Sequence, residues 1–352
     1  MASAPRVQRL HDGNPILQRI EDHPWENRVT FNPACAFVSD RPMLQAIIRS
    51  LPFDEPTREL LLTQEGLCFL LYRAQGARRA EYDHARSSMG LAVLSPRLEL
   101  LARYGSPVIL PDRPYEDLGV EDARITQVGD RFYAFYTAYH SGKPNNSVRI
   151  ALASTTDFFR WEKHGLLKGD FNGMNNKNAM LLPGKIDGKH IMFHRPMEGR
   201  DRMAIHWAES NDVLGPWKTR GLLMKPLRDP GYEDTWTGGG PPPLLLPDGR
   251  YLIIYHNGNR KADGSRVYEL AIAIGDPRAQ GFIVRRDEPL LRPETQAETQ
   301  GDAELGVNNV VFACGCYFYK HDLYLPYAGA DSVVSAAMIP ADEIMRYVGK
   351  RS

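Results

Sequence analysis

Short apolar and aromatic segments recur along the chain at a nearly constant spacing. Four of them begin at or just after a Gly or Asp turn signal, and each contains an aromatic residue close to a polar one. The five segments are Gly66–Ala74, Asp130–Tyr139, Gly188–Pro196, Gly249–Asn257 and His321–Gly329. Their central aromatic residues, from Tyr72 to Tyr327, follow one another at steps of 64, 57, 62 and 72 residues. Such a period predicts a repeated structural unit.

A second segment, rich in small and β-branched residues, follows each of the five. These segments are Ser87–Ser95, Val148–Thr156, Arg202–Ser210, Tyr268–Asp276 and Val333–Ala341. Small and branched side chains are typical of strands that pack between neighbouring strands and sheets. Each repeat is therefore predicted to be a β-meander.

Helical periodicity is confined to Pro42–Leu62, where Pro52 separates two predicted short helices. Five meanders predict an all-β chain, a five-bladed β-propeller with this short helical insertion near the N-terminus. A single domain over residues 1–352 follows, because no Gly/Ser/Pro-rich break divides the repeats. The alternative is a β-sandwich or a series of separate β domains, and the regular step argues against it.

A propeller predicts where the polar ends of the repeats meet. The innermost strands of its blades line one central channel, so the ends of the repeats converge on the channel mouth. The polar residues at these ends are Arg73, Tyr139, Arg195, His256 and Asp331. We therefore expect them to share a pocket that suits a polar ligand with an anionic part.

Composition excludes some partners. The chain has 43 Lys plus Arg and 43 Asp plus Glu, so its net charge gives no general attraction to nucleic acid or to an anionic membrane. The four cysteines show no zinc-ligand spacing and are expected to be buried free thiols. The N-terminal residues lack a signal-peptide core, and no apolar run approaches about 18 residues, so a cytoplasmic protein without a membrane span is expected.

Glu121, Asp122 and Arg124 stand directly before the aromatic segment of the second repeat. A carboxylic acid that protonates a leaving oxygen needs a raised pKa, which burial or a neighbouring like charge provides. Asp122 is the candidate for such an acid. Taken alone, however, the sequence VEDAR favours a structural salt bridge.

Candidate anion-binding residues fall into two groups. Lys177, Asn178 and Arg195 belong to the third repeat, and His256 and Tyr268 belong to the fourth. Arginine, lysine and imidazole groups bind tetrahedral oxyanions. Each residue alone is more typical of a satisfied polar group at a strand end, but the propeller would bring them together. The sequence contains no metal-binding, phosphate-loop or nucleophile-elbow motif, so neither a metal nor a cofactor is expected.

Six motifs of this chain occur in the order and spacing of glycoside hydrolase family 130, the β-mannoside phosphorylases and related β-mannosidases. They are GVEDARI, FYAFYTAY, KNAMLLPGKIDGKHIMFHRP, GGGPPPLLLPDGRYLIIYHN, NNVVFACG and PYAGADSVV. The chain resembles this family from about Asn14 to Tyr347. The resemblance implies a five-bladed propeller, in agreement with the count of repeats.

The resemblance also implies a mechanism. Asp122 would be the general acid, delivering its proton directly or through a sugar hydroxyl. Inorganic phosphate would attack the anomeric carbon from the opposite face, with inversion, and give α-mannose 1-phosphate. The implied phosphate ligands are Lys177, Asn178, Arg195, His256 and Tyr268. The implied ligands of the sugar at the cleavage point are Arg73, Arg124, Asp331 and Asn32.

Two positions depart from the family pattern. Lys177 stands where an arginine is common, and Trp236 stands where a lysine is common. Hydrolytic members lack much of the phosphate cluster and use carboxylates to activate water, and Glu233 and Asp234 are nearby candidates for that role. The retained ligands nevertheless favour phosphorolysis of β-1,4- or β-1,2-mannobiose or mannooligosaccharides.

Three further questions stay open at this point. An inverting β-mannosidase is the alternative function, and a non-catalytic sugar-binding propeller is the second. A homo-oligomer is neither indicated nor excluded. The helical insertion is expected either to cap the acceptor side of the site or to form a subunit interface.

Overall fold

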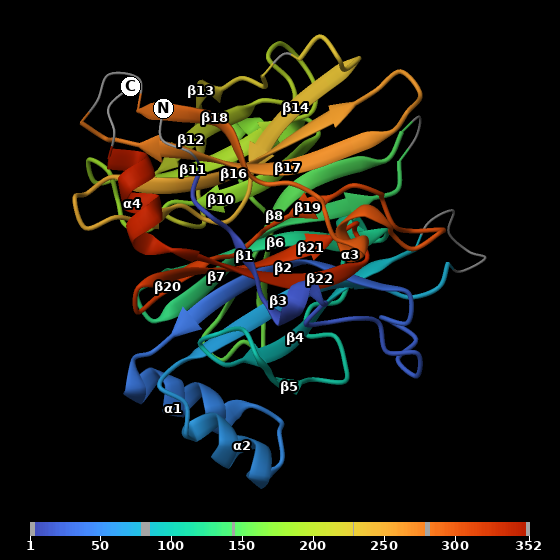
Figure 1. Cartoon of the computed structure of the whole chain (residues 1–352), viewed down its shortest axis with the longest axis vertical. Helices are drawn as coiled ribbons and strands as arrows, with labels where there is room; N and C mark the ends of the chain where they lie inside the picture. The colour runs from blue at the N-terminus through green and yellow to red at the C-terminus, as the bar shows by residue number, and fades with distance from the viewer. Residues whose placement is uncertain (1–3, 79–84, 143–144, 228, 279–281, 350–352) are drawn as a thin grey trace.

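The computed structural model describes residues 4–78, 85–142, 145–227, 229–278 and 282–349, and this part of the chain is mostly β-sheet (Figure 1). The strands are β1 Gln8–Arg9, β2 Val29–Val38, β3 Leu67–Gln75, β4 Ser87–Leu94, β5 Leu100–Arg103, β6 Gly119–Val128, β7 Arg131–His140, β8 Ser147–Thr155, β9 Glu162–Leu166, β10 Asn176–Leu181, β11 His190–Pro196, β12 Ile205–Ser210, β13 Lys218–Met224, β14 Asp234–Gly239, β15 Leu244–Leu245, β16 Tyr251–Arg260, β17 Arg266–Gly275, β18 Ile283–Leu291, β19 Val311–Phe312, β20 Tyr317–Tyr319, β21 Asp322–Gly329 and β22 Val333–Pro340. The helices are α1 Arg41–Ser50, α2 Glu55–Leu62, α3 Gln296–Thr299 and α4 Ala341–Gly349.

Hydrogen bonds join the described strands into four sheets. Three of them have the orders β10-β11-β12-β13, β14-β16-β17-β18 and β1-β22-β21-β19, with β15 beside β16 and β20 beside β21. The fourth has the order β2-β3-β4-β6-β7-β8-β9, with β5 beside β4. This large sheet consists of two antiparallel runs that are joined by one parallel pairing, between Ser87 and Gly119.

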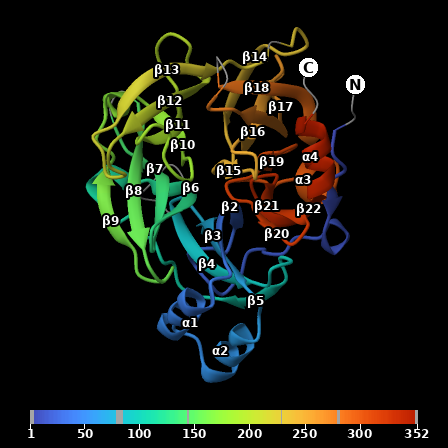
Figure 2. The ribbon, with the colours of Figure 1, turned by 90° about the vertical axis from the view of Figure 1, so that its left-hand side faces the viewer.

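The predicted strand pairs are confirmed in every repeat. The aromatic segments form β3, β7, β11, β16 and β21, and the small-residue segments form β4, β8, β12, β17 and β22. The antiparallel runs are arranged around a central region, with β2, β6, β10 and β19 toward the centre and β5, β9 and β13 toward the outside (Figure 2). The fold is therefore propeller-like.

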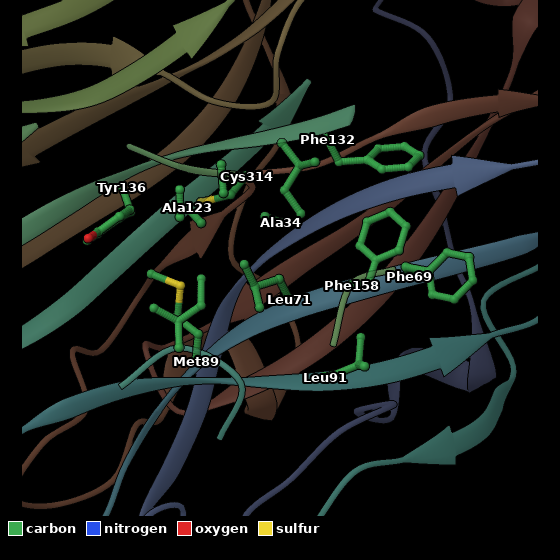
Figure 3. Close-up of a cluster of buried hydrophobic side chains, with 14 of the residues drawn as sticks. Ala34, Phe69, Leu71, Met89, Leu91, Ala123, Phe132, Tyr136, Phe158 and Cys314 are labelled. Carbon is green, nitrogen blue, oxygen red and sulfur yellow. The ribbon is translucent and has the colours of Figure 1, made fainter. Parts of the chain in front are cut away.

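Aromatic and small apolar side chains fill the space between neighbouring runs. Phe69 of β3 stacks on Phe158 at a centroid distance of 4.4 Å, and Phe132 of β7 lies at the same distance from Phe158 (Figure 3). All three rings are essentially inaccessible to solvent. Burying such a ring contributes about 2–3 kcal/mol, so this cluster fixes the run β2–β5 against the run β6–β9.

The two predicted helices of the insertion are confirmed as α1 and α2. Asp40 and Asp54 cap their N-termini by accepting hydrogen bonds from the N–H groups of Met43 and Thr57. The insertion connects β2 to β3 at the end where Val38 pairs with Leu67. The predicted site residues Asn32 and Arg73 lie at the opposite ends of these two strands, so the insertion does not cap the site.

The N-terminal segment completes the last sheet. β1 pairs with β22, and the guanidinium of Arg9 contacts Glu298 at 2.8 Å. Glu298 also accepts a hydrogen bond from the Tyr327 hydroxyl, so the two ends of the chain are held in one sheet. The four cysteines are free, as predicted, and Cys316 alone among them is partly exposed. None of the described helices has the length and apolar character needed to cross a membrane.

Candidate functional site

Three strands that lie toward the centre of the fold, β2, β6 and β10, each contain a β-bulge. The strand register shifts between Phe31 and Ala34, between Glu121 and Arg124, and between Lys177 and Met180. Each bulge contains one residue with a left-handed backbone, namely Asn32 (φ 46°), Asp122 (φ 52°) and Asn178 (φ 58°). Such a conformation costs on the order of 1 kcal/mol for a residue other than glycine, and it concentrates at functional sites. The bulges direct these side chains toward neighbouring runs, because Asn32 contacts Asp122 and Asn178 contacts His256.

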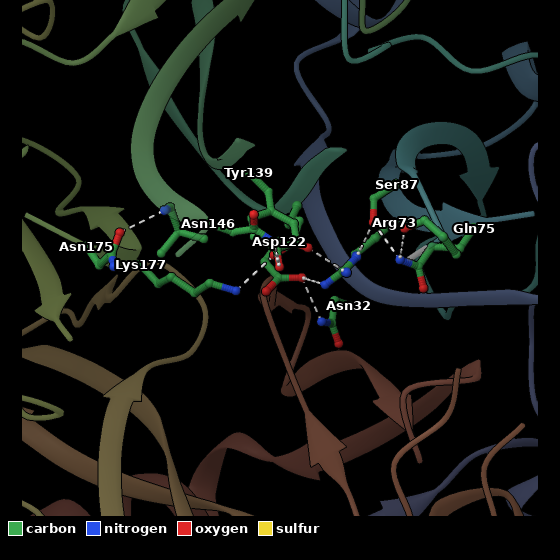
Figure 4. Close-up of polar contacts among 12 residues, drawn as sticks. Asn32, Arg73, Gln75, Ser87, Asp122, Tyr139, Asn146, Asn175 and Lys177 are labelled. Carbon is green, nitrogen blue, oxygen red and sulfur yellow. Dashed lines mark hydrogen bonds and ion pairs between the residues drawn. The ribbon is translucent and has the colours of Figure 1, made fainter. Parts of the chain in front are cut away.

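The two adjacent acids of the second repeat divide the nearby cations between them. Asn32 donates to Oδ1 of Asp122 at 2.7 Å, and Arg73 donates to the same oxygen at 3.2 Å (Figure 4). Arg73 also donates to Glu121 at 2.8 Å, and Lys177 donates to the other oxygen of Glu121 at 2.9 Å. Asp122 therefore faces the site with one oxygen bonded, while Glu121 holds the two cations in place.

The charges around Asp122 oppose the predicted raised pKa. Burial raises the pKa of this carboxyl, but the charges of Arg73, Lys177 and Arg124 and the hydrogen bond from Asn32 outweigh it. The pKa of Asp122 is thus held well below its ordinary value in the ligand-free protein. The raised pKa is not observed, because Arg73 of β3 and Lys177 of β10 lie beside Asp122 in addition to Arg124, and the sequence did not indicate these two cations.

Asp331 lies in the same group and behaves in the opposite way. Burial and the neighbouring charge of Asp122 raise the pKa of Asp331 to about 6, although Arg73 and Lys177 act against the rise. The site therefore contains two carboxyl groups whose pKa values are pushed apart, a pattern that is typical of acid–base sites.

Arg124 is a structural residue in this arrangement. It is fully buried, and its three nitrogens donate to the backbone oxygens of Gly240, Asp122 and Gly239 at 3.2, 2.9 and 2.8 Å. The prediction that Arg124 contacts the sugar stays a prediction, because none of these contacts tests it. Arg124 ties the bulge of β6 to β14 and so positions Asp122.

Residues of the predicted basic group contact one another. Arg195 of β11 donates to Nε2 of His256 on β16 at 3.1 Å, and Nδ2 of Asn178 lies 3.3 Å from the same nitrogen. Gly238 makes this contact possible, because a Cβ there would lie 2.4 Å from Asn178 Nδ2 and 2.6 Å from His256 Nε2. The glycine at this position thus leaves room for the side chains that form the basic group.

Several buried donors in this region have no acceptor. Nε of Arg195, Nδ1 of His256 and Nε1 of Trp236 are inaccessible and reach no acceptor in good hydrogen-bond geometry, although Nδ1 of His256 faces the backbone of Gly239 and Nε1 of Trp236 faces the Tyr268 hydroxyl. Buried donors without partners are rare in folded proteins. The indole of Trp236 packs over Gly258, and its ring centroid lies 5.3 Å from that of Tyr268. An acceptor-rich ligand would satisfy these donors.

The remaining predicted residues make other contacts. The hydroxyl of Tyr139 accepts a hydrogen bond from Asn146 at 3.3 Å, at the end of β7 (Figure 4). Glu233 is exposed, and Asp234 lies 3.5 Å from Arg260 at the start of β14. Both acids line a separate cavity of about 750 Å³. Neither of them contacts Arg195 or His256 among the described interactions.

Two contributions were not found from the sequence. Glu121 was treated only as a neighbour of Asp122, although it bridges Arg73 and Lys177. Trp236 was identified as a lost cation, but its unpartnered N–H was not foreseen. The adjacency of two acids was the available signal for Glu121. Nothing in the sequence indicated the orientation of the indole.

Comparisons with known proteins identify the family of this chain. Residues 61–350 match the model of glycoside hydrolase family 130, described as beta-1,4-mannooligosaccharide phosphorylase. A 1,2-beta-oligomannan phosphorylase of Thermoanaerobacter sp. (strain X514) is 29% identical over 96% of this chain and 99% of its own. A beta-1,4-mannooligosaccharide phosphorylase of Ruminococcus albus is 29% identical over 66% of this chain and 65% of its own.

A solved structure extends the comparison to the fold. It comes from a study reporting that family 130 contains glycoside hydrolases that target β-1,2-mannosidic linkages in Candida mannan. It superimposes with a TM-score of 0.75 and 26% identity, over 97% of this chain and 95% of the other. Since the family model covers most of the chain, the protein belongs to glycoside hydrolase family 130.

Proposed function

We propose that this protein is a β-mannoside phosphorylase that cleaves β-mannosides with inorganic phosphate and releases α-mannose 1-phosphate. The observation that carries the proposal is the proximity of an acid to a group of anion-binding donors. The charge of Asp122 acts on Arg195, which bonds to His256 beside Asn178, and Nε of Arg195 has no acceptor. A glycosidic bond between them would have a proton donor near its oxygen and an anion near its carbon.

Asp122 is the proposed general acid, and its proton would depend on the second substrate. In the ligand-free protein, nearby cations keep the pKa of Asp122 low. A phosphate ion beside Arg195 adds negative charge to the same site, and this raises the pKa of Asp122. Phosphate binding would therefore prepare the acid as well as supply the nucleophile. Tyr268 and Lys177 are proposed as further phosphate ligands.

Arg73, Asp331 and Asn32 are the proposed ligands of the sugar at the cleavage point. Arg73 and Asn32 already contact Asp122, so hydroxyl groups bound by them would lie next to the acid. We further propose a propeller of five blades, each containing one of the five antiparallel runs. In that arrangement β2, β6, β10, β14 and β19 would be the innermost strands.

We base the proposed linkage of the substrate on the names of the relatives. The Thermoanaerobacter relative, which spans nearly the whole chain, is named for β-1,2-linked oligomannan, so β-1,2-mannobiose and β-1,2-oligomannan are the first candidate substrates. β-1,4-Mannooligosaccharides are the second, in line with the description of the family.

Hydrolysis by an inverting β-mannosidase is the second candidate function. It is favoured by the related solved structure, which comes from the study of hydrolases that target β-1,2-mannosidic linkages. An inverting hydrolase needs a second carboxylate that activates water across the bond. Among the described residues, Glu233 and Asp234 lie in a separate cavity, and Glu121 is bonded to two cations. Asp331, which lies close to Asp122, is a further acid that a hydrolase could use. The positions of Glu233 and Asp234, the acids predicted for that role, support phosphorolysis.

The test compares sugar release with and without phosphate. The protein is incubated with β-1,2- and β-1,4-mannobiose, and mannose and mannose 1-phosphate are quantified separately. We expect mannose 1-phosphate only when phosphate is present. Equal release of free mannose under both conditions would establish the hydrolase instead, and no release from any β-mannoside would leave a sugar-binding protein.

A further inference from the structure

The anion site contains one cation without a carboxylate partner. Arg73 and Lys177 are paired with Glu121 and Asp122, and the donors of Arg124 point to backbone oxygens. Arg195 forms no ion pair with a carboxylate in the described part of the chain. Trp236 adds an N–H group but no charge. An anion in this site would therefore bind next to one guanidinium, that of Arg195, whose charge is not balanced by a carboxylate.

His256 presents a lone pair to the same site. The guanidinium of Arg195 can only donate, so Nε2 of His256 must accept, and the proton of the neutral ring is on Nδ1. Asn178 approaches the same nitrogen with its amide. Nε2 is thus an acceptor that would face the oxygen atoms of a bound phosphate, which are also acceptors. A hydrogen bond can form between them only if one of these oxygen atoms carries a proton.

We infer that the site takes phosphate as its protonated monoanion, with the P–O–H group donating to Nε2 of His256 and two other oxygens accepting from Arg195 and Trp236. The inference rests on the proposed phosphorolysis and specifies the form of its second substrate. One negative charge matches one uncompensated guanidinium. The acidic proton of the ligand satisfies the lone pair that Arg195 and Asn178 release when they turn to phosphate oxygens.

The surroundings of His256 keep its ring neutral. Arg195 on β11 and Arg124 on β6 are the cations that face it, and Asp122 on β6 is the acid. The rings of Tyr268 and Phe312 lie 6.1 and 4.6 Å from the imidazole. Burial, together with the two cations, holds the pKa of His256 well below its ordinary value. The ring is therefore neutral and able to accept a hydrogen bond at neutral pH.

The affinity for sulfate distinguishes this arrangement from a site that binds anions through charge alone. Sulfate has the shape of phosphate, but at neutral pH it carries two charges and no proton, so it leaves the lone pair of Nε2 facing an oxygen. An unmatched buried polar contact weakens binding by about 10- to 100-fold. A site that bound through charge alone would prefer the doubly charged ion.

Titration calorimetry of the whole chain with inorganic phosphate and with inorganic sulfate tests the inference. At about pH 6, where phosphate retains its second proton, we expect phosphate to bind about 10- to 100-fold more tightly than sulfate. At higher pH, the affinity for phosphate should fall with the monoanion fraction. Equal or tighter binding of sulfate at about pH 6 would overturn the inference.

Variants locate the acceptor. His256→Phe removes the lone pair and should reduce the preference for phosphate over sulfate at least about tenfold, whereas His256→Gln, which keeps an acceptor, should retain it. Trp236→Phe removes a donor and should weaken both ions alike. An unchanged preference in a folded His256→Phe protein would contradict the inference, and if this variant does not fold, the wild-type titrations still decide.

The same experiments separate the inference from the proposed function. Phosphate-dependent turnover together with equal binding of sulfate would overturn the inference alone. Absence of phosphate binding would overturn both.

Discussion

Asn32 and Asp122 meet at 2.7 Å, although each lies in a β-bulge of a different innermost strand. Both residues have a left-handed backbone. The contact joins the run that begins with β2 to the run that begins with β6, and it fixes one oxygen of the carboxylate. The strained backbone conformations of both residues thus orient the carboxylate of Asp122. Such strain is typical of functional sites, where it is retained despite its cost in stability.

Replacing Asp122 by Asn should abolish turnover while keeping the fold. The amide can still accept from Asn32 but cannot donate a proton to a leaving oxygen at a useful rate. Loss of a general acid costs about 10²- to 10⁴-fold. The measurement is mannose 1-phosphate release at saturating phosphate, with circular dichroism as a check on folding. Asp130→Asn, a substitution in the turn before β7, is the control and should leave the rate unchanged.

Replacing Asp331 by Asn should stabilise the protein at neutral pH and weaken sugar binding. The folded state raises the pKa of Asp331 from 3.8 to about 6. It therefore binds this proton more tightly than the unfolded chain does, so stability falls as pH rises from about 4 to about 6 and stays lower above that. The largest gain expected from the neutral amide is about 3 kcal/mol.

Urea denaturation of wild type and Asp331→Asn at about pH 4 and about pH 7.5 provides the check. The variant should gain stability relative to wild type only at the higher pH. A loss of stability at the higher pH would mean that the carboxylate is stabilised by Arg73 more than it is penalised by burial.

The strand pairs were predictable because large aromatic residues recur at a nearly constant spacing along the sequence. Aromatic anchors such as Tyr72 and Tyr136 recur once per repeat, and strand pairs follow directly from them. Short or irregular elements carry no such period. β1 is two residues long, and α4 follows β22 without a break, so neither was predicted. The pairing of β1 with β22 depends on contacts between the two ends of the chain, which local pattern does not encode.

The sequence indicated which residues come together, but it did not indicate how their charges shift the pKa of Asp122. The ends of the repeats do bring Arg73, Arg195, His256 and Asp331 into one group. The pKa of Asp122, however, depends on cations that come from β3 and β10, and their distances cannot be read from a sequence. The role of Arg124 was missed for the same reason, because its partners are backbone oxygens more than 100 residues away.

Replacing Gly238 by Ala should impair phosphate binding before it impairs the fold. The added Cβ would lie 2.4 Å from Nδ2 of Asn178 and 2.6 Å from Nε2 of His256. Displacing these side chains separates the groups that are proposed to hold phosphate, so KM for phosphate should rise at least about tenfold. Overpacking of this kind costs about 1–3 kcal/mol of stability.

Gly173→Ala is the matched control for this variant, because an added Cβ at Gly173 meets nothing within 4 Å. Both proteins are assayed at several phosphate concentrations with the mannoside held constant. A normal KM for phosphate in Gly238→Ala would show that Asn178 and His256 do not need their observed positions to bind it.

Replacing Glu121 by Gln should move the pH dependence of turnover to lower pH. The substitution removes a negative charge beside Asp122 and frees Arg73 and Lys177 from their carboxylate partner. Both effects lower the pKa of Asp122, because they favour its charged form. A general acid is active only while protonated, so activity should begin to fall at a lower pH than in wild type. On the alkaline side of the profile, the rate should be about tenfold lower for each pH unit by which the pKa of the acid falls.

The profile of kcat against pH at saturating phosphate measures this change in the Glu121→Gln protein. Glu162→Gln is the matched control, because it removes an exposed partner of Arg131 on β9 and should leave the profile in place. If Glu121→Gln also left it in place, the cations held by Glu121 would not control the acid.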